Sequence, residues 1–287
     1  VVLLMFAQPF IGKSEKGHRF NIGFLWCLLI GAGALTFLAF SEDRANKKHF
    51  AAVEEADWLA KRVVEIADKQ GIPPSGAVTL LREDHENRAR HLFSSNCASC
   101  HLYNGHDGRG FPVDSNQSAP DLAGFASRAW LEGLLDYDHY VSTKYFGGTA
   151  FKDGKMATKV LKKFGEKEKA LVPKVAALLS DIAGLPYQEP LSEKEREEGF
   201  NVFFDELGCI DCHDIEDEDE GSAPDLTGYG SRDWLAAIVS DPSHERFYGK
   251  DNDRMPSFAR DEKLTGEEIG ILVDWLRSKS SADSAVR

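Results

Sequence analysis

The sequence predicts an all-α protein with one membrane-spanning helix followed by two similar helical modules. Residues 20–40 form a run of 21 residues without a charge. Apolar residues further along recur at helical spacing, and a 14-residue segment occurs twice. We divide the chain at these features into residues 1–19, 20–40 (the span), 41–81 (a helical spacer), 82–187 (the first module) and 188–287 (the second module).

The run at residues 20–40 predicts a transmembrane helix. At 1.5 Å per residue it extends roughly 30 Å, which matches the hydrocarbon core of a bilayer. A secretory signal peptide is the alternative, but its apolar region would be shorter and would end in a small-residue cleavage site. Residues 36–40 contain no good site of that kind.

The residues before the span are apolar from the start, and no initiator methionine precedes them. We expect residues 1–11 to be the end of an earlier span and residues 12–19 to be a short turn. Lys13, Lys16 and Arg19 in that turn favour the cytoplasmic side.

Residues 50–69 predict an amphipathic helix, because their apolar side chains form one stripe of helical spacing. Glycine and proline in residues 71–76 end it. Two interpretations stay open. The helix rests on the membrane surface or on a partner, or it packs against the first module.

The two modules share a repeated segment at residues 118–131 and 222–235, in which ten of fourteen positions are identical. This identity favours duplication over chance. One helix is expected to enter each module and another to close it. The entering helices are predicted at 83–95 and 193–206, and the closing helices at 168–183 and 265–278. Pro173 is expected to make the first closing helix begin later.

Each module contains one Cys-x-x-Cys-His motif, the covalent attachment signature of c-type haem. Two thiols three residues apart on a turn can bond the two haem vinyl groups, and the next residue then faces the iron. The sequence therefore predicts two covalently bound haem c groups. The attachment residues are Cys97, Cys100, Cys209 and Cys212, and the proximal iron ligands are His101 and His213.

A zinc ribbon is the main alternative for these motifs. Its knuckles stand roughly 12 to 20 residues apart, whereas about a hundred residues separate the motifs here, and a ribbon does not require a histidine after both. Structural disulfides are also disfavoured, since adjacent Cys-x-x-Cys pairs mostly form labile redox bridges. The fifth cysteine, Cys27, is interpreted as a small packing residue.

Two methionines are candidates for the sixth iron ligand. Each module holds one, Met156 and Met255, in a loop sequence before the closing helix. A thioether ligand raises the haem potential relative to two histidines. His139 and His244, upstream of these methionines, are the alternative ligands.

The order of helix, Cys-x-x-Cys-His, Pro-x-Leu loop, methionine loop and closing helix in each module resembles class I cytochrome c. The resemblance implies that the carbonyl group of Pro120 accepts a hydrogen bond from His101 and that of Pro224 from His213. Arg128 and Arg232, in the repeated segment, are candidate partners of the haem propionates. A surface ion pair is the alternative for both arginines.

Residues 9–21 and the span after them resemble the last hairpin of the carboxy-terminal part of cytochrome b, also called subunit IV. Some bacteria fuse that part to a dihaem cytochrome c, and the whole chain is similar to such a fusion. No quinol-site or haem b residues occur in these 287 residues.

The resemblances imply an electron-transfer subunit of a quinol:cytochrome c oxidoreductase that is not catalytic alone. Its partners would be cytochrome b, a Rieske protein, a soluble cytochrome c or a terminal oxidase, and membrane lipid. The haem modules would lie on the periplasmic side of a bacterial inner membrane. The alternative is the dihaem subunit of a high-affinity haem-copper oxidase. A dihaem peroxidase is disfavoured by one methionine per module. The net charge of -13 argues against nucleic acid as a partner.

Overall fold

The computed structural model describes residues 10, 14–113, 118–215 and 221–278. All regular elements within these residues are helical and none is a strand, which confirms the predicted all-α class. The contacts divide the chain into two units, Val1–Glu54 and Glu55–Arg287, and each is described by itself. The α-helices are α2 (Glu15–Ala45), α3 (Lys47–Gln70), α4 (Ala77–Glu83), α5 (His85–Asn96), α6 (Arg128–Leu134), α7 (Tyr137–Tyr140), α8 (Glu166–Ala183), α9 (Glu193–Asn201), α10 (Arg232–Ser240) and α11 (Gly266–Leu276). The short 3-10 and π-helical turns are η1 (Ala150–Asp153), η2 (Met156–Val160), η3 (Leu161–Lys163), η4 (Val202–Glu206), η5 (Cys209–Asp211) and η6 (Gly249–Asp251).

The N-terminal unit consists mainly of α2, a helix of 31 residues that extends about 46 Å. It is long and apolar enough to cross a membrane. Leu35 and Phe37 are 70% and 73% exposed, as expected for side chains that face lipid. The unit therefore has the length and the surface of a membrane anchor.

The predicted turn at residues 12–19 is wrong in its second half, because α2 already begins at Glu15. The hydroxyl group of Ser14 accepts a hydrogen bond from the backbone N–H of Gly17 at 3.1 Å and caps the helix. This cap lets the helix continue through charged residues ahead of the apolar run. The earlier span expected at residues 1–11 lies outside the described residues, apart from Phe10.

The part of α3 that belongs to the C-terminal unit packs against the first module. Glu55 is 4% exposed, and its carboxylate accepts hydrogen bonds from Arg90 Nη2 at 2.5 Å and Arg109 Nε at 3.0 Å. The guanidinium group of Arg90 also lies 3.7 Å from the ring centroid of Trp58. Of the two interpretations of this helix, the structure therefore shows the second.

Glu55→Ala is expected to lower the free energy of unfolding by about 2–4 kcal/mol, because two guanidinium groups would lose the carboxylate that neutralises them. Asp57→Ala is the matched control. Its pair with Lys61 is 2.6 Å long, but both side chains are more than half exposed, so its loss should cost under about 1 kcal/mol. Urea unfolding of the two variants measures the difference, and equal effects would contradict the packing described for α3.

The entering helices agree with the prediction in position but differ in form. α5 ends directly before the first Cys-x-x-Cys-His motif. In the second module, the predicted helix is divided into α9 and the π-helical turn η4. Single π-helical turns are often found near functional sites.

The closing helices are α8 and α11, and the delayed start predicted for α8 is wrong. Pro173 lies inside α8, which begins at Glu166. Its neighbours Val172 and Val175 are 8% and 1% exposed. Burial of this stripe outweighs the one backbone hydrogen bond that proline removes, since packing commonly overrides local propensity.

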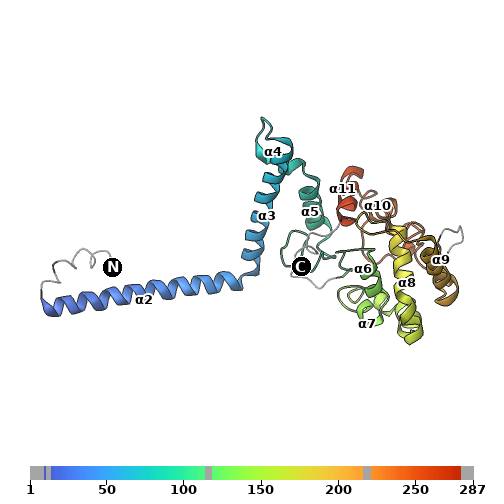
Figure 1. Cartoon of the computed structure of the whole chain (residues 1–287), viewed down its shortest axis with the longest axis horizontal. Helices are drawn as coiled ribbons and strands as arrows, with labels where there is room; N and C mark the ends of the chain where they lie inside the picture. The colour runs from blue at the N-terminus through green and yellow to red at the C-terminus, as the bar shows by residue number, and fades with distance from the viewer. Residues whose placement is uncertain (1–9, 11–13, 114–117, 216–220, 279–287) are drawn as a thin grey trace. The chain divides into compact units, whose positions relative to one another are not determined.

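The helices of the two modules are exchanged in space, as Figure 1 shows within the C-terminal unit. α5 of the first module packs against α11 of the second, and α9 of the second packs against α8 of the first. α6 with α8, and α10 with α11, still pack within their own modules. The boundary between residues 187 and 188 is thus a boundary of the sequence repeat, while the contacts join both modules into one unit.

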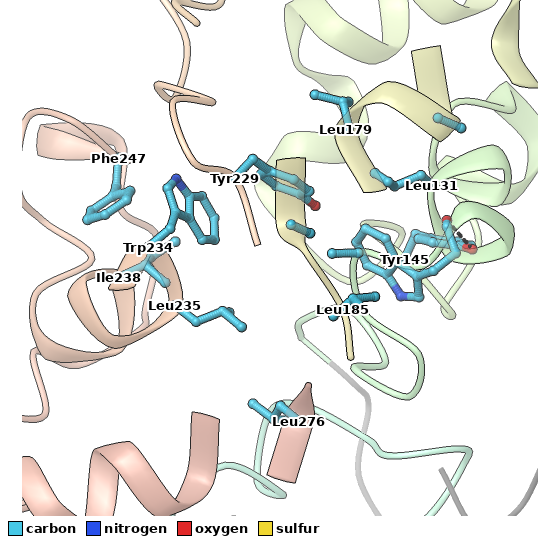
Figure 2. Close-up of a cluster of buried hydrophobic side chains, with 14 of the residues drawn as sticks. Leu131, Tyr145, Leu179, Leu185, Tyr229, Trp234, Leu235, Ile238, Phe247 and Leu276 are labelled. Atoms are coloured by element: carbon cyan, nitrogen blue, oxygen red, sulfur yellow. Dashed lines mark hydrogen bonds between the residues drawn. The ribbon is translucent and has the colours of Figure 1, made fainter. Parts of the chain in front are cut away.

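The two modules share one hydrophobic core. Figure 2 shows part of this core, in which Tyr229 of the second module lies among side chains from both modules. The rings of Phe125 and Tyr229, at equivalent positions of the repeated segments, have centroids 5.6 Å apart. A Cβ atom on Gly230 would lie 2.7 Å from Ala126 Cβ and 2.9 Å from Ala183 Cβ. The joint between the modules therefore requires glycine at position 230.

Gly230→Ala is expected to lower the free energy of unfolding by about 2–4 kcal/mol. The reasons are that alanine is strained in the left-handed backbone conformation of this residue (φ +70) and that its Cβ atom overpacks the joint. Gly249→Ala is the matched control, because Gly249 has φ +51 but nothing within 4 Å of the added Cβ. It should cost only the backbone strain of about 1 kcal/mol. Thermal unfolding compares the two variants. A loss of stability in Gly230→Ala no larger than that in Gly249→Ala would contradict the close packing described for the joint.

Candidate functional site

The first motif forms one turn that continues from the end of α5. The backbone N–H of Cys97 donates to Phe93 O at 2.8 Å, and the N–H of His101 donates to Cys97 O at 2.8 Å. The N–H of Cys100 donates to the same Cys97 oxygen at 3.0 Å. The turn thus presents two thiols and one imidazole from five consecutive residues.

The second motif has the same backbone pattern after a sharper entry. Gly208 precedes it with φ +61, a left-handed conformation that suits glycine. The N–H groups of Cys212 and His213 donate to Cys209 O at 3.2 and 3.0 Å. Both motifs therefore position their side chains by the same local hydrogen bonds.

A proline carbonyl group orients each motif histidine. His101 Nδ1 lies 2.8 Å from Pro120 O, and His213 Nδ1 lies 2.8 Å from Pro224 O. A carbonyl oxygen only accepts, so Nδ1 carries the proton and Nε2 keeps its lone pair. Burial lowers the pKa of both imidazoles, which favours the neutral form that binds metal ions. The donor atoms thus fit axial ligation of a haem iron.

The segment that carries Pro120 is fixed from several directions. The N–H of Leu122 donates to Leu102 O at 2.8 Å, directly after the motif, and the N–H of Asp121 donates to Lys144 O at 2.9 Å. The indole N–H of Trp130 donates to Asp121 O at 3.0 Å. The proline carbonyl is therefore held in place before any ligand binds.

The second module repeats this arrangement. The N–H of Leu226 donates to Asp214 O at 2.8 Å, and the N–H of Asp225 donates to Arg246 O at 2.9 Å. The indole N–H of Trp234 donates to Asp225 O at 3.1 Å. Trp130 and Trp234 were not singled out from the sequence, and their identity at equivalent positions of the repeated segment is the signal that could have indicated this role.

The four motif cysteines are partly buried. Burial raises the pKa of the Cys97 thiol to about 12 and that of the Cys209 thiol to about 11. All four motif cysteines are free of disulfide bonds. Neutral thiols at Cys97 and Cys209 fit the formation of thioethers with an apolar macrocycle.

A zinc ribbon does not form. Within the described residues, which include all four motif cysteines, no group of three or more His, Cys, Asp or Glu side chains could hold a metal ion. Two separate cysteine pairs, each with its own histidine, remain.

Both candidate methionines pack against the core and are partly buried. Met156 opens the π-helical turn η2, so part of the loop expected around it is helical. Met255 precedes α11, and its carbonyl oxygen accepts a hydrogen bond from Asn252 Nδ2 at 2.8 Å. His139 and His244 are exposed, which disfavours them as ligands of a buried iron. Thioether ligation stays a prediction.

The two arginines of the repeated segment have protein partners. The guanidinium group of Arg232 forms hydrogen bonds with both carboxylate oxygens of Asp274, at 2.7 and 3.1 Å. Arg128 Nη2 donates to Glu189 O at 2.8 Å. The ion-pair alternative thus describes Arg232, and a propionate role for either residue stays a prediction.

Comparison with known proteins agrees with this geometry. The family model described as cytochrome c matches residues 87–179 and again residues 197–280. Neither the curated proteins nor the solved structures contain a match to this chain. The two matched stretches cover more than half of the sequence and contain both motifs. The chain belongs to the cytochrome c family and is an electron-transfer haem protein, whose cytochrome c domains imply covalently bound haem c.

Proposed function

We propose that the chain is the membrane-anchored dihaem subunit of a quinol:cytochrome c oxidoreductase. It would take electrons from a Rieske iron-sulfur protein and pass them to a soluble cytochrome c or a terminal oxidase. The observation that carries the proposal is the order of elements: an apolar helix of membrane-spanning length precedes two cytochrome c stretches. The likeness of residues 9–21 and the span to the end of cytochrome b supports this complex.

Each module would attach one haem through the cysteines and the histidine of its own motif. Cys97 and Cys100 supply thioether bonds in the first module, and Cys209 and Cys212 in the second. When bound, a haem iron gains and releases one electron. The protein provides ligation, orientation and burial. Each imidazole is oriented by a hydrogen bond of 2.8 Å from its Nδ1 atom to a proline carbonyl oxygen, that of Pro120 for His101 and that of Pro224 for His213.

The anchor would place both modules outside the cytoplasm of a bacterial cell, because haem is attached to c-type cytochromes there.

An acidic surface suits a basic electron acceptor. The chain carries a net charge of -13, and complementary charge raises the rate of encounter between proteins.

Purification of the tagged chain from its own membranes in mild detergent tests this assignment. We expect cytochrome b and a Rieske protein to co-purify, and the preparation to reduce cytochrome c with a quinol. A preparation that contains copper, consumes oxygen and lacks cytochrome b would contradict the proposal and favour the haem-copper oxidase. A resting high-spin ferric signal that binds peroxide would contradict an electron-carrier role altogether.

A further inference from the structure

Trp275 of the second module packs beside the first haem motif. Its ring centroid lies 4.3 Å from that of Tyr103, in a stacked arrangement, and 5.5 Å from that of Phe93. Phe93 is fully buried and Tyr103 is 6% exposed. Phe93 is one helical turn before Cys97, and Tyr103 is two residues after His101. A side chain of α11 therefore contacts both flanks of the motif in the other module.

The loop after the first motif closes over the same side chains. Gly108 has φ +85, and a Cβ atom there would lie 2.8 Å from Phe93 Cδ1 and 3.4 Å from Trp275 Cη2. Arg88 of α5 and Glu267 of α11 form an ion pair of 2.8 Å at the same helix contact. The helix that leads into the first motif is thus covered by the loop after the motif and by the closing helix of the second module.

The second module receives a reciprocal contact from the first. A Cβ atom on Gly199 in α9 would lie 2.8 Å from Leu178 Cβ in α8 and 3.4 Å from Lys174 O. Leu178 is fully buried, and Lys174 also pairs with Glu198 at 3.1 Å. α8 therefore supports the helix that leads into the second motif.

The two helix contacts between the modules, α5 with α11 and α9 with α8, are related by approximate twofold symmetry. At the joint, Phe125 contacts Tyr229, and Ala126 faces Gly230. Both are pairs of equivalent positions in the repeated segment, and self-contact of equivalent positions is the mark of a twofold interface. The C-terminal unit is thus built like a helix-exchanged dimer within a single chain.

We propose that the closing helix of each module completes the haem site of the other, and that Trp275 is a positioning residue for the haem on Cys97 and Cys100. The inference rests on the proposed attachment of two haems. Trp275 fixes Tyr103, and the adjacent Leu102 O accepts the N–H of Leu122 at 2.8 Å. That hydrogen bond holds the segment whose Pro120 carbonyl orients His101.

Hydrogen exchange of the full-length protein, followed by mass spectrometry, tests the proposal. In Trp275→Ala, the amides of α5 (residues 85–96) should exchange about tenfold faster or more, while those of α9 (residues 193–201) keep their rates. Trp275→Phe should show the same pattern more weakly if the alanine variant fails to fold. The matched variant Leu178→Ala should accelerate α9 and spare α5. Faster exchange in α9 alone, or equally in both helices, after a change at Trp275 would overturn the proposal.

A second measurement addresses the haems directly. In protein that keeps only the haem on Cys97 and Cys100, Trp275→Phe should shift the reduction midpoint. In protein that keeps only the other haem, the midpoint should not move. A shift confined to the second haem would overturn the positioning role. Absence of haem from the wild-type protein would instead overturn the proposed function, and the exchange rates of α5 and α9 would still decide whether the helices are exchanged.

Discussion

Replacement of both cysteines of one motif, as in Cys209→Ala with Cys212→Ala, is expected to halve the covalent haem content from two groups to one. The vinyl groups would have no thiol to bond in that module, while the first motif would keep both thiols and His101. Cys97→Ala with Cys100→Ala should have the same effect on the other haem. The haem absorbance per polypeptide and the intact mass measure the loss.

Cys27→Ala provides the matched control for both double variants. Cys27 is an exposed residue of α2, far along the sequence from either motif. Its replacement should leave two haems in place. Loss of a haem from this control, or retention of both haems by a motif variant, would contradict the assignment of the attachment residues.

Met255→Ala is expected to lower the reduction potential of one haem by a substantial part of the roughly 0.8 V range that axial ligands cover. Loss of the thioether ligand also removes its far-red absorption from that haem. Met156→Ala should do the same to the other haem. Spectroelectrochemical titration separates the two midpoints and shows which haem changes.

Alanine variants of His139 and His244 are the controls for the methionine ligands. Both histidines are exposed, and their removal should leave both midpoints unchanged. An unchanged titration in Met255→Ala, or a large shift in His244→Ala, would refute ligation by Met255 and assign the sixth position to the histidine.

Local sequence was sufficient to predict much of the candidate site. The motif turn depends on hydrogen bonds within five residues, and the closing helices begin at local signals such as the capping box of Thr265 and Glu268. The resemblance to class I cytochrome c indicated the bonds from His101 to Pro120 and from His213 to Pro224, and both are present.

The pairing of helices could not be predicted from the sequence. A stripe of apolar residues shows that a helix face is buried, but not which partner covers it. The two modules are similar, so α5 could accept α8 or α11 by pattern alone. The choice depends on contacts such as Trp275 with Tyr103, between residues far apart in the chain.

Two smaller features of the fold could not be predicted for the same reason. The burial of Glu55 depends on Arg90 of α5 and on Arg109 of the loop after the first motif, and the helical pattern of α3 contains neither. The continuation of α8 through Pro173 depends on the buried stripe around it. Both features depend on contacts distant in sequence, and at Pro173 these contacts outweigh a local signal.

The intact mass of the wild-type protein under denaturing conditions shows whether two haem groups are covalently attached. We expect a mass that exceeds the polypeptide by two haem groups, with one haem on the peptide containing Cys97 and Cys100 and one on the peptide containing Cys209 and Cys212. A single haem, or haem that separates from the chain on denaturation, would contradict this expectation.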